Sequence, residues 1–271
     1  MPELPEVETT RRGIEPHLVG HRITRVVVRE PRLRWPVPGD LEGHLRGYRI
    51  SAVTRRAKYL LLHTADGCLM MHLGMSGSLH LVPDTMPPKR HDHLDLCLDS
   101  MQRLRFTDPR RFGSVHWLNG SANEHPLLRS LGPEPLAKDF DGKYLYRVSR
   151  KRRLAVKSFI MDSHIVVGVG NIYASEALFA AAIHPSRSAG RISQKRYAAL
   201  ARAIQSTLKA AISQGGTTLR DFTASDGRPG YFRQALAVYG RRDQPCPRCS
   251  TPIRARRIGQ RNSFYCAACQ K

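Results

Sequence analysis

The sequence predicts an α+β chain of several domains: a β-rich N-terminal part, a helical middle part and a small C-terminal zinc module. Three observations support this division. Short β-rich runs fill residues 22–120, an apolar residue recurs at every fourth position later in the chain, and two CxxC pairs stand near the C-terminus. A length of 271 residues is enough for a sizeable core and for more than one domain.

The N-terminal part begins with a helix and continues as strands. The opening MPELPEVETT places Pro5 in the first turn of a helix predicted over roughly residues 5–17, where a proline is tolerated. The following runs include ITRVVV, KYLLLHT, CLMMHL and HLDLCL. HLDLCL alternates strictly, and turn signals such as ADG and PGD separate the runs. The pattern is typical of a β-sandwich or a β-barrel.

Helices are predicted to dominate from about residue 144 to about 213. A stretch that contains proline and glycine, LGPEPLAKDFDG, leads into this part. The apolar positions of its last helix are Leu200, Ile204, Leu208 and Ile212. Gly215 and Gly216 end this run, and the tail from residue 240 combines eight basic residues with a single acid.

The six cysteines fall into two groups. Cys68 and Cys97 lie in apolar, strand-like runs and are expected to be small buried hydrophobes. The other four form two CxxC pairs separated by sixteen residues, namely Cys246, Cys249, Cys266 and Cys269. This spacing predicts one structural Zn²⁺ with four sulfur ligands and no open position for water. A redox role is the alternative, but one redox pair would not need a second pair at this spacing.

The charge excess indicates a polyanionic partner. With 44 Lys and Arg against 22 Asp and Glu, the formal net charge is +22. Each Lys or Arg placed on a phosphate releases a condensed counterion, so nucleic acid is the expected partner. A membrane surface is the weaker alternative, because no apolar run is long enough to span a bilayer. Charged residues begin at Glu3, so no signal peptide is expected, and the sequence predicts a cytoplasmic protein with reduced thiols.

Two features of the helical part suggest a surface for a nucleic-acid backbone. The segment VVGVGNIYASE predicts a glycine turn before Asn171 and a helix that begins near Ile172. N–H groups exposed at such a turn bind phosphate, although an ordinary turn between helices has the same pattern. The basic run at 150–153, followed by Lys157, favours the phosphate-binding interpretation.

Two loops of the β-rich part combine an apolar side chain with glycine or arginine. HLGMSGS places Met75 at a predicted loop tip, and DPRRFG places Arg110 and Phe112 on another turn. A Met or Phe at the end of a strand usually belongs to the core. An apolar side chain beside arginine also suits a wedge that enters a base stack, as an enzyme that extracts a base from a duplex requires.

A series of motifs along the chain resembles the bacterial formamidopyrimidine-DNA glycosylase family. The motifs occur in the family's order from residue 2 to residue 271: PELPEVET, RAKY, HLGMSGS, KRHDH, TDPRRFG, VVGVGNIYASEALF, GGTTLRDF, DGRPGYF and the terminal CxxC pairs. The resemblance implies an N-terminal β-sandwich catalytic domain with the first helix over 2–130, a helix–two-turns–helix domain over 131–228, and a zinc finger with a β-hairpin over 229–271. It also implies a monomer of the bacterial cytoplasm and nucleoid.

The activity implied by the resemblance is base-excision repair of DNA. Members of the family act on double-stranded DNA that contains oxidised bases or abasic sites, held in a cleft between the two halves of the protein. They excise oxidised purines, chiefly 8-oxoguanine and formamidopyrimidines, and then nick the abasic strand by β,δ-elimination. The nucleophile is the amine of an N-terminal proline, which corresponds to Pro2 once Met1 is removed.

The resemblance also assigns the remaining catalytic residues. Glu3 is the general acid/base at the sugar oxygen, supported by Glu6; Lys58 aids β-elimination, and Arg261 serves δ-elimination and phosphate binding. An α-amino group with a pKa of about 7.7–8.0 is partly neutral near pH 7, and the positive end of a helix disfavours its protonation further. The two acids oppose this effect unless one of them is protonated. Acids are also common in a first helical turn without any catalytic role.

The DNA contacts implied by the resemblance fall into three groups. The expected phosphate contacts are His72, His91, Arg153, Lys157 and Asn171. Met75, Arg110 and Phe112 are expected to fill the gap left by a flipped base. Glu176 and residues 217–223 are candidate contributors to the base pocket.

Two alternatives remain at this level. The endonuclease VIII branch of the same superfamily prefers oxidised pyrimidines; its members tend to begin PEGPE, whereas this chain has Leu4. A non-enzymatic zinc-ribbon DNA-binding protein would account for the charge and the cysteines but gives no reason for Pro2, Glu3 and Lys58.

Overall fold

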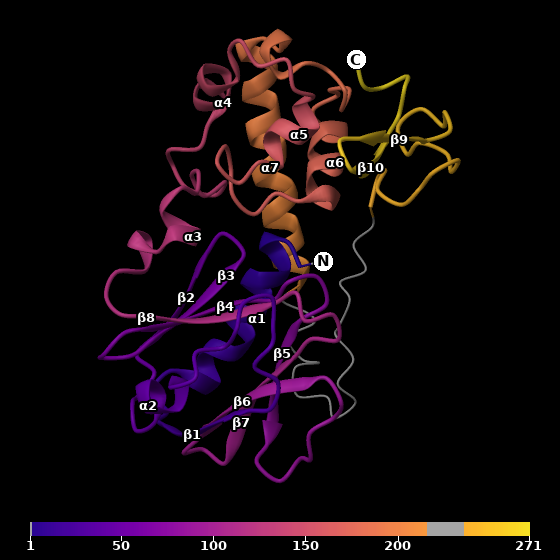
Figure 1. The fold of residues 1–271 in the computed structure, drawn as a ribbon. Coiled ribbons are helices and arrows are strands. Elements are labelled where there is room, and N and C mark those ends of the chain that lie inside the picture. The colour runs from indigo at the N-terminus through magenta and orange to yellow at the C-terminus, as the bar shows by residue number, and fades with distance from the viewer. Residues whose placement is uncertain (1, 216–235) are drawn as a thin grey trace. The chain divides into compact units, whose positions relative to one another are not determined.

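The computed structural model describes residues 2–215 and 236–271. The chain falls into two compact units. One contains Met1–Arg129 and the end of the longest helix from Ile212; the other contains Ser130–Ala211 and the C-terminal module. Each is described by itself (Figure 1).

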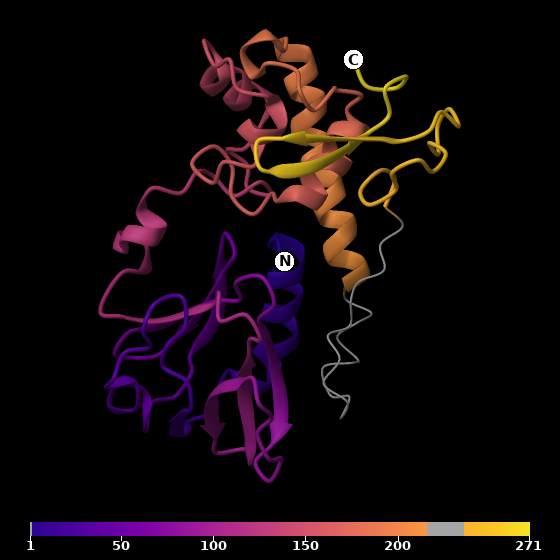
Figure 2. The same ribbon diagram turned by 45° about the vertical axis from the view of Figure 1, so that its right-hand side comes forward.

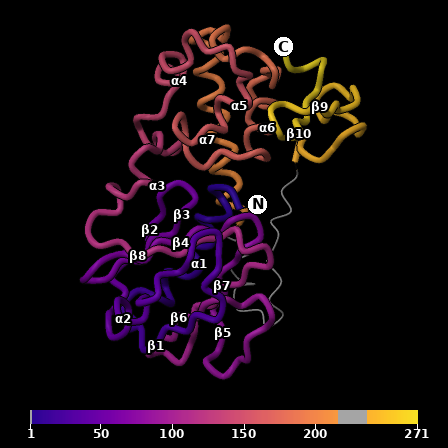
Figure 3. Tube along the Cα trace, in the orientation of Figure 1, coloured from indigo at the N-terminus to yellow at the C-terminus, as the bar shows by residue number. Residues whose placement is uncertain are grey.

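The first unit contains two four-stranded antiparallel sheets, which confirms the sandwich. One sheet has the strand order β2-β3-β4-β8 and the other β1-β6-β7-β5 (Figures 1 and 3). The strands are β1 (Ile23–Val28), β2 (Ala52–Arg56), β3 (Tyr59–His63), β4 (Cys68–His72), β5 (Ser78–Pro83), β6 (Asp92–Leu98), β7 (Gln102–Thr107) and β8 (Ser114–Leu118). Their apolar side chains form one continuous core.

Helix α1 (Leu4–Leu18) packs against strands of both sheets, since it contacts β2, β3 and β5. Its buried apolar residues are Leu4, Val7, Ile14 and Leu18. The last three of these belong to the sandwich core, so this helix is part of the domain from its first turn onward. The unit is completed by the short helices α2 (Leu41–Leu45), η1 (Ala122–Glu124) and α3 (Pro126–Arg129).

Strand β6 is buried along its whole length, although its sequence alternates between apolar and polar residues. The polar face is covered by arginines: Arg105 donates two hydrogen bonds to the carboxylate of Asp95, at 2.9 and 3.0 Å, and Arg29 donates a third. Burial alone would raise the pKa of Asp95, but these bonds lower it below its ordinary value. The negative charge of Asp95 in HLDLCL is therefore balanced by two arginines inside the protein.

The second unit is built from helices and a hairpin. Its helices are α4 (Gly142–Ser149), α5 (Val156–Ile160), α6 (Asn171–Ala180), η2 (Ala189–Arg191) and α7 (Gln194–Gly215, whose last residues belong to the first unit). Strands β9 (Arg254–Ile258) and β10 (Arg261–Tyr265) form an antiparallel hairpin that lies beside α6 (Figure 2). Among the described residues, no helix combines the length and the apolar character needed to cross a membrane.

The cysteine-bearing module packs directly on α6. Arg248, between the first two cysteines, donates hydrogen bonds to the carbonyls of Phe179 and Ala180 at the C-terminal end of that helix, at 3.1 and 3.3 Å. Its guanidinium also lies 4.4 Å from the centre of the Phe179 ring. The side chain of Gln270 donates to the carbonyl of Ile183 at 2.9 Å. The module and the helical part therefore form one body.

Candidate active site and nucleic-acid interface

The first residues of the chain form a rigid helix start. Pro2 is half-buried and precedes Glu3, the N-cap residue of α1, which is 1% exposed. The backbone N–H of Glu3 donates to a carboxylate oxygen of Glu6 at 2.8 Å. Two acidic side chains thus lie beside Pro2, at the positive end of the helix dipole. Met1 lies outside the described residues.

Lys58 lies in the two-residue turn of the β2–β3 hairpin. Its neighbour Ala57 has φ = 55°, and Arg56 pairs with Tyr59 across the turn. The Tyr59 ring lies 4.8 Å from the ring of His72, at the end of the adjacent strand β4. Lys58 is close enough to His72 to contribute to its titration. The structure therefore brings these two predicted site residues together.

His72 is neutral at physiological pH. Burial, and after it the positive charges of Lys58 and Arg34, lowers its pKa to about 4. Its Nδ1 accepts a hydrogen bond from the backbone N–H of Gly74 at 2.9 Å, so the ring proton resides on Nε2. A phosphate at this position would receive one neutral N–H rather than an imidazolium charge.

Met75 and Phe112 lie on two neighbouring loops of the same unit. Phe112 is 42% exposed, and the guanidinium of Arg110 lies 4.7 Å from the centre of its ring. Met75 and His91 are both partly exposed. The sequence prediction missed Arg34, whose backbone N–H donates to the carbonyl of Gly113 at 3.1 Å. An arginine in the RLRW run gives no periodic signal that would distinguish it from a solvated charge.

In the second unit, Asn171 is the first residue of α6. Gly170 is the N-cap and Gly168 has φ = 78°, a left-handed conformation that glycine adopts without strain. The structure therefore has a glycine turn directly before the first residue of this helix.

Lys157, an expected phosphate contact, is buried and hydrogen-bonded. Its side chain is 1% exposed, and its ammonium donates to three acceptors. These are Asn171 Oδ1 at 2.6 Å, the carbonyl of Asn262 at 3.1 Å and Ser263 Oγ at 2.8 Å. The residue joins α5, α6 and β10, because a buried ammonium must be hydrogen-bonded. In the structure Lys157 therefore holds Asn171 in place, and its own contact with a phosphate stays a prediction.

Glu176, a candidate for the base pocket, is buried and hydrogen-bonded. It is 8% exposed, and its carboxylate accepts three backbone N–H groups, those of Ala237, Val238 and Tyr239, at 2.8–2.9 Å. These bonds fix the segment that leads into the cysteine module. Residues 217–223, the other candidates for the base pocket, lie outside the described residues.

The basic run at 150–153 divides into two kinds of arginine. Arg150 donates to the carbonyls of Gly190 and Ile192 at 2.8 and 2.9 Å, and so fastens the chain that precedes α7. Arg153 is exposed. The periodicity of the sequence could not separate the two, because both belong to one short basic run.

A surface pocket surrounds Asn171 and the tip of the hairpin. Arg261 is the first residue of β10, adjacent to the two-residue turn, and is exposed. The pocket is lined by Asn171, Tyr239, Gly240, Arg257, Gln260, Arg261, Asn262 and Phe264. The sequence prediction named only Asn171 and Arg261 among these residues. The concentration of basic residues in the tail was a signal for Arg257 alone among the others.

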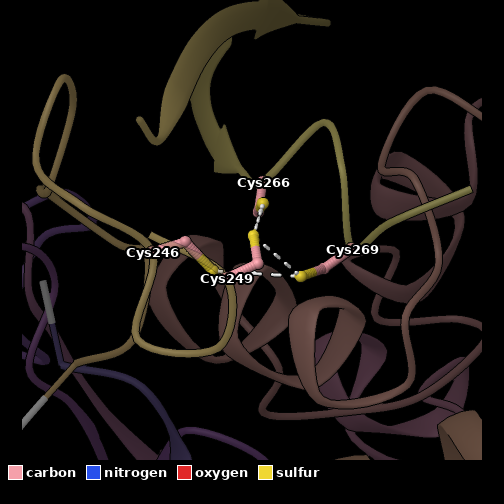
Figure 4. A group of neighbouring side chains, drawn as sticks. All are labelled: Cys246, Cys249, Cys266 and Cys269. Atoms are coloured by element: carbon pink, nitrogen blue, oxygen red, sulfur yellow. Dashed lines mark hydrogen bonds between the residues drawn. The ribbon is translucent and has the colours of Figure 1, made fainter. Parts of the chain in front are cut away.

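The four predicted zinc ligands converge at the base of the hairpin (Figure 4). Cys249 Sγ lies 3.5 Å from Cys266 Sγ and 3.4 Å from Cys269 Sγ, and Cys246 Sγ lies 4.0 Å from Cys269 Sγ. All four sulfurs lie within 4.8 Å of one another. A tetrahedral zinc with Zn–S bonds of about 2.3 Å holds its sulfurs about 3.8 Å apart, so the arrangement fits one structural ion. Cys68, by contrast, is buried, which raises its pKa to about 12 and makes it an unreactive thiol.

A β-sandwich with acidic groups at its first helix and a helical unit with a basic zinc finger define a class of DNA-processing protein. Comparisons with known proteins identify the family. The formamidopyrimidine-DNA glycosylase N-terminal domain matches residues 1–115, the H2TH domain of the same proteins matches 131–223, and the zinc finger found in FPG and IleRS matches 243–271. The chain belongs to the formamidopyrimidine-DNA glycosylase family, as the sequence motifs predicted.

Relatives and solved structures agree over the whole length. The formamidopyrimidine-DNA glycosylases of Syntrophotalea carbinolica and Marinobacter nauticus are 61% and 59% identical to this chain, with full coverage of both chains in each case. The MutM (Fpg) protein from Thermus thermophilus is 38% identical with a TM-score of 0.85, over 99% of this chain and 98% of that one. The Lactococcus lactis Fpg (MutM), solved with DNA containing Fapy-dG, is 32% identical with a TM-score of 0.89, over 99% and 100% of the two chains.

The pKa of His72 predicts a defined pH dependence of stability. The unfolded chain takes up a proton at this residue below about pH 6.5, whereas the folded chain does so only near pH 4, so stability falls as the pH falls through this window. His72→Asn should therefore reduce the loss of unfolding free energy between pH 7 and pH 5 by about 2 kcal/mol relative to the wild type. Urea unfolding at the two pH values measures this loss, and an equal loss in both proteins would contradict the assignment.

Loss of one zinc ligand should remove the metal and DNA binding from the second unit and leave the folding of the first unit unchanged. Cys249→Ser is expected to lose the metal and to abolish DNA binding, because the zinc organises the hairpin that carries Arg261. Metal analysis and titration with labelled duplex measure both effects. Trp35 and Trp117 both lie in the first unit, so unfolding followed by tryptophan emission should be unchanged. Cys68→Ala is the matched control and should keep its zinc; intact nicking after chelation would refute this prediction.

Proposed function

We propose that this chain is a bifunctional DNA glycosylase and AP lyase that removes oxidised purines, 8-oxoguanine and formamidopyrimidines, through a Schiff base on Pro2. The start of α1 gives the main support: a proline directly precedes a buried glutamate at the positive end of a well-packed helix. Family membership supports the same reaction, and so does the Lactococcus lactis relative, which was solved in complex with a Fapy-dG containing DNA.

The nucleophile is the secondary amine of Pro2, exposed when Met1 is removed. Its lone pair forms a bond to C1′ of the damaged nucleotide, and the base leaves with the electron pair of the glycosidic bond. The nitrogen then loses its proton, the C1′–O4′ bond breaks with protonation of the ring oxygen, and an iminium forms directly because the nitrogen of proline already carries two carbon substituents. The positive iminium acidifies the C2′ proton; its loss expels the 3′ phosphate, and a second elimination expels the 5′ phosphate.

The surroundings of Pro2 suit both halves of this reaction. The dipole of α1 favours the neutral, nucleophilic amine at its N-terminus. Glu3 acts as general acid and base at the sugar oxygen, since it is adjacent to the nucleophile and held by the helix start. Glu6 supports it by accepting the backbone N–H of Glu3.

Lys58 serves proton transfer and His72 serves phosphate binding in the proposed reaction. A two-residue turn limits the number of positions open to Lys58, which assists β-elimination at C2′. His72 donates its Nε2–H to a phosphate beside the lesion without adding charge. His91 is a further phosphate contact on the loop before β6.

Residues of the second unit bind the sugar-phosphate backbone. Asn171, Arg257 and Arg261 line one pocket that suits a phosphate, and Arg153 adds an exposed charge. Arg261 also serves the second elimination. Lys157 positions Asn171. The ligand is double-stranded DNA with an oxidised base or an abasic site, and the protein acts as a monomer at the nucleoid of the bacterial cytoplasm.

Met75, Arg110 and Phe112 form the wedge that fills the gap left by the extruded base. An exposed aromatic ring stacked with a guanidinium combines an apolar surface for base pairs with a donor for base edges. Such a group lowers the free-energy cost of keeping the damaged base outside the stack.

Reduction with borohydride tests the proposed chemistry. Wild-type protein and a duplex with 8-oxoguanine opposite C should form a covalent adduct, because borohydride reduces the iminium to a stable amine. Pro2→Gly, or a form with Met1 retained, should give no adduct while binding the same duplex. A wild-type protein that binds this DNA but forms no adduct would indicate a non-enzymatic DNA-binding protein.

The choice of lesion separates the two branches of the superfamily. Single-turnover cleavage should be faster on a duplex with 8-oxoguanine opposite C than on one with thymine glycol opposite A. Both strands are otherwise identical, and a preformed abasic site in the same position serves as control for elimination. Faster cleavage of the thymine glycol duplex would assign the chain to the endonuclease VIII type of specificity.

A further inference from the structure

The two wedge loops are locked together at their backbones. We define the Met75 loop as residues 73–77 and the Phe112 loop as residues 108–113. Gly74 has φ = 65°, and a Cβ added to it would lie 2.4 Å from the carbonyl carbon of Phe112. A Cβ added to Gly113 would lie 2.8 Å from the carbonyl oxygen of His72. Gly74 is therefore required by the close approach of the two loops, and Gly113 by its contact with strand β4 just before the Met75 loop.

A buried carboxylate lies at this contact. Asp108 is fully buried, at 0% exposure. Its Oδ1 accepts the hydroxyl of Ser76, from the Met75 loop, at 2.7 Å, and the backbone N–H of Arg110 at 3.3 Å. Its Oδ2 accepts the backbone N–H of Gly113 at 2.7 Å. One side chain thus bonds to the loop that carries Met75, to the first residue of the Arg110–Phe112 segment and to Gly113, which follows that segment.

The backbone of Asp108 is fixed as firmly as its side chain. Its N–H donates to the carbonyl of His91 at 3.0 Å, and its carbonyl accepts from Nε2 of His93 at 2.7 Å. His93 is itself buried in β6. Asp108 therefore connects both loops to strand β6 in the core of the sandwich. Its hydrogen bonds to this part of the chain fix the position of its carboxylate.

We propose that Asp108 is a positioning residue that holds Met75, Arg110 and Phe112 as one preformed wedge for base extrusion, an inference that rests on the proposed function. Its carboxylate replaces the water that would otherwise solvate the two loops and fixes their separation before DNA arrives. A wedge that is already assembled loses less conformational entropy on insertion into the duplex.

The requirement is for a carboxylate, because both oxygens must accept. In Asp108→Asn, the NH2 group of the amide faces a backbone N–H in either orientation of the side chain, that of Gly113 in one and that of Arg110 in the other. Two donors cannot pair, so the Phe112 loop must move away from its partner. The chain also offers a smaller change: Ser76→Ala removes only the hydroxyl bridge between the loops, and Ser76→Thr restores a hydroxyl.

The test compares a duplex in which a base must be extruded with one in which no base is present. Asp108→Asn should slow single-turnover excision of 8-oxoguanine from a duplex roughly 100-fold, the scale of loss that misplaced positioning groups cause. Nicking of a preformed abasic site should change by less than about threefold, because that site needs no base extrusion. A 2-aminopurine placed opposite the lesion should lose the fluorescence change that reports wedge insertion. Ser76→Ala should show the same pattern more weakly, and Ser76→Thr should recover it.

Three results would overturn the proposal. Equal loss on both substrates would show that Asp108 only maintains the fold, and an unchanged rate on both would show that the contact is unnecessary. If Asp108→Asn does not fold, Ser76→Ala decides alone, and excision and fluorescence equal to the wild type would reject the wedge role. Asp99→Asn, which removes a carboxylate paired with His21 elsewhere in the same unit, is the matched control. A wild-type protein inactive on both duplexes would instead reject the proposed function.

Discussion

The catalytic proposal depends on a single constraint, that the end of the chain must be as well fixed as its core. Chain termini normally fray, because few contacts hold them. Here the backbone N–H of Glu3 is bonded to Glu6, and the very next residues, Leu4 and Pro5, are buried. The helix therefore transmits the rigidity of the sandwich to Pro2, the proposed nucleophile.

The charged side chains of this protein fall into two groups, buried ones that are paired or hydrogen-bonded and exposed ones that carry the net charge. Inside the sandwich, Asp95 is matched by Arg105 and Arg29, so the strand that carries it can be buried on both faces. In the second unit, Arg150 satisfies backbone carbonyls. The excess positive charge that remains is carried by exposed side chains such as Arg153 and Arg261. The buried charged groups named here are all paired or hydrogen-bonded. The exposed arginines carry the net positive charge that attracts a polyanion.

Patterns of neighbouring residues predicted the fold class, because the conformation of a strand, a turn or a metal loop depends mainly on residues close together in the sequence. Alternation and turn residues indicated the sandwich, and the spacing of the cysteines indicated the metal site, since ligand geometry constrains spacing directly. The sequence could not show which polar groups would find partners across long separations. Lys157 and Glu176 look like exposed ligands in one dimension, yet each is bonded to residues more than sixty positions away.

The same limit explains the residues that the sequence prediction missed. Arg34, Tyr239 and Arg257 belong to no motif with a fixed spacing, and only the folded chain places them beside His72 or Asn171. Asp108 is a different case. The motif that contains it was recognised for its arginine and phenylalanine, whereas the role of its acid depends on a serine in another loop.

Because of its arginine-rich hairpin, the stability of the zinc finger depends on whether a polyanion is bound to it. Arg254, Arg256 and Arg257 are all exposed on one short strand, where like charges repel each other in the free protein. A polyanion relieves that repulsion whether or not it contains a lesion, and any ligand that binds only the folded state stabilises it. The finger is consequently least stable when it is free in solution, and undamaged DNA protects it during the search for damage.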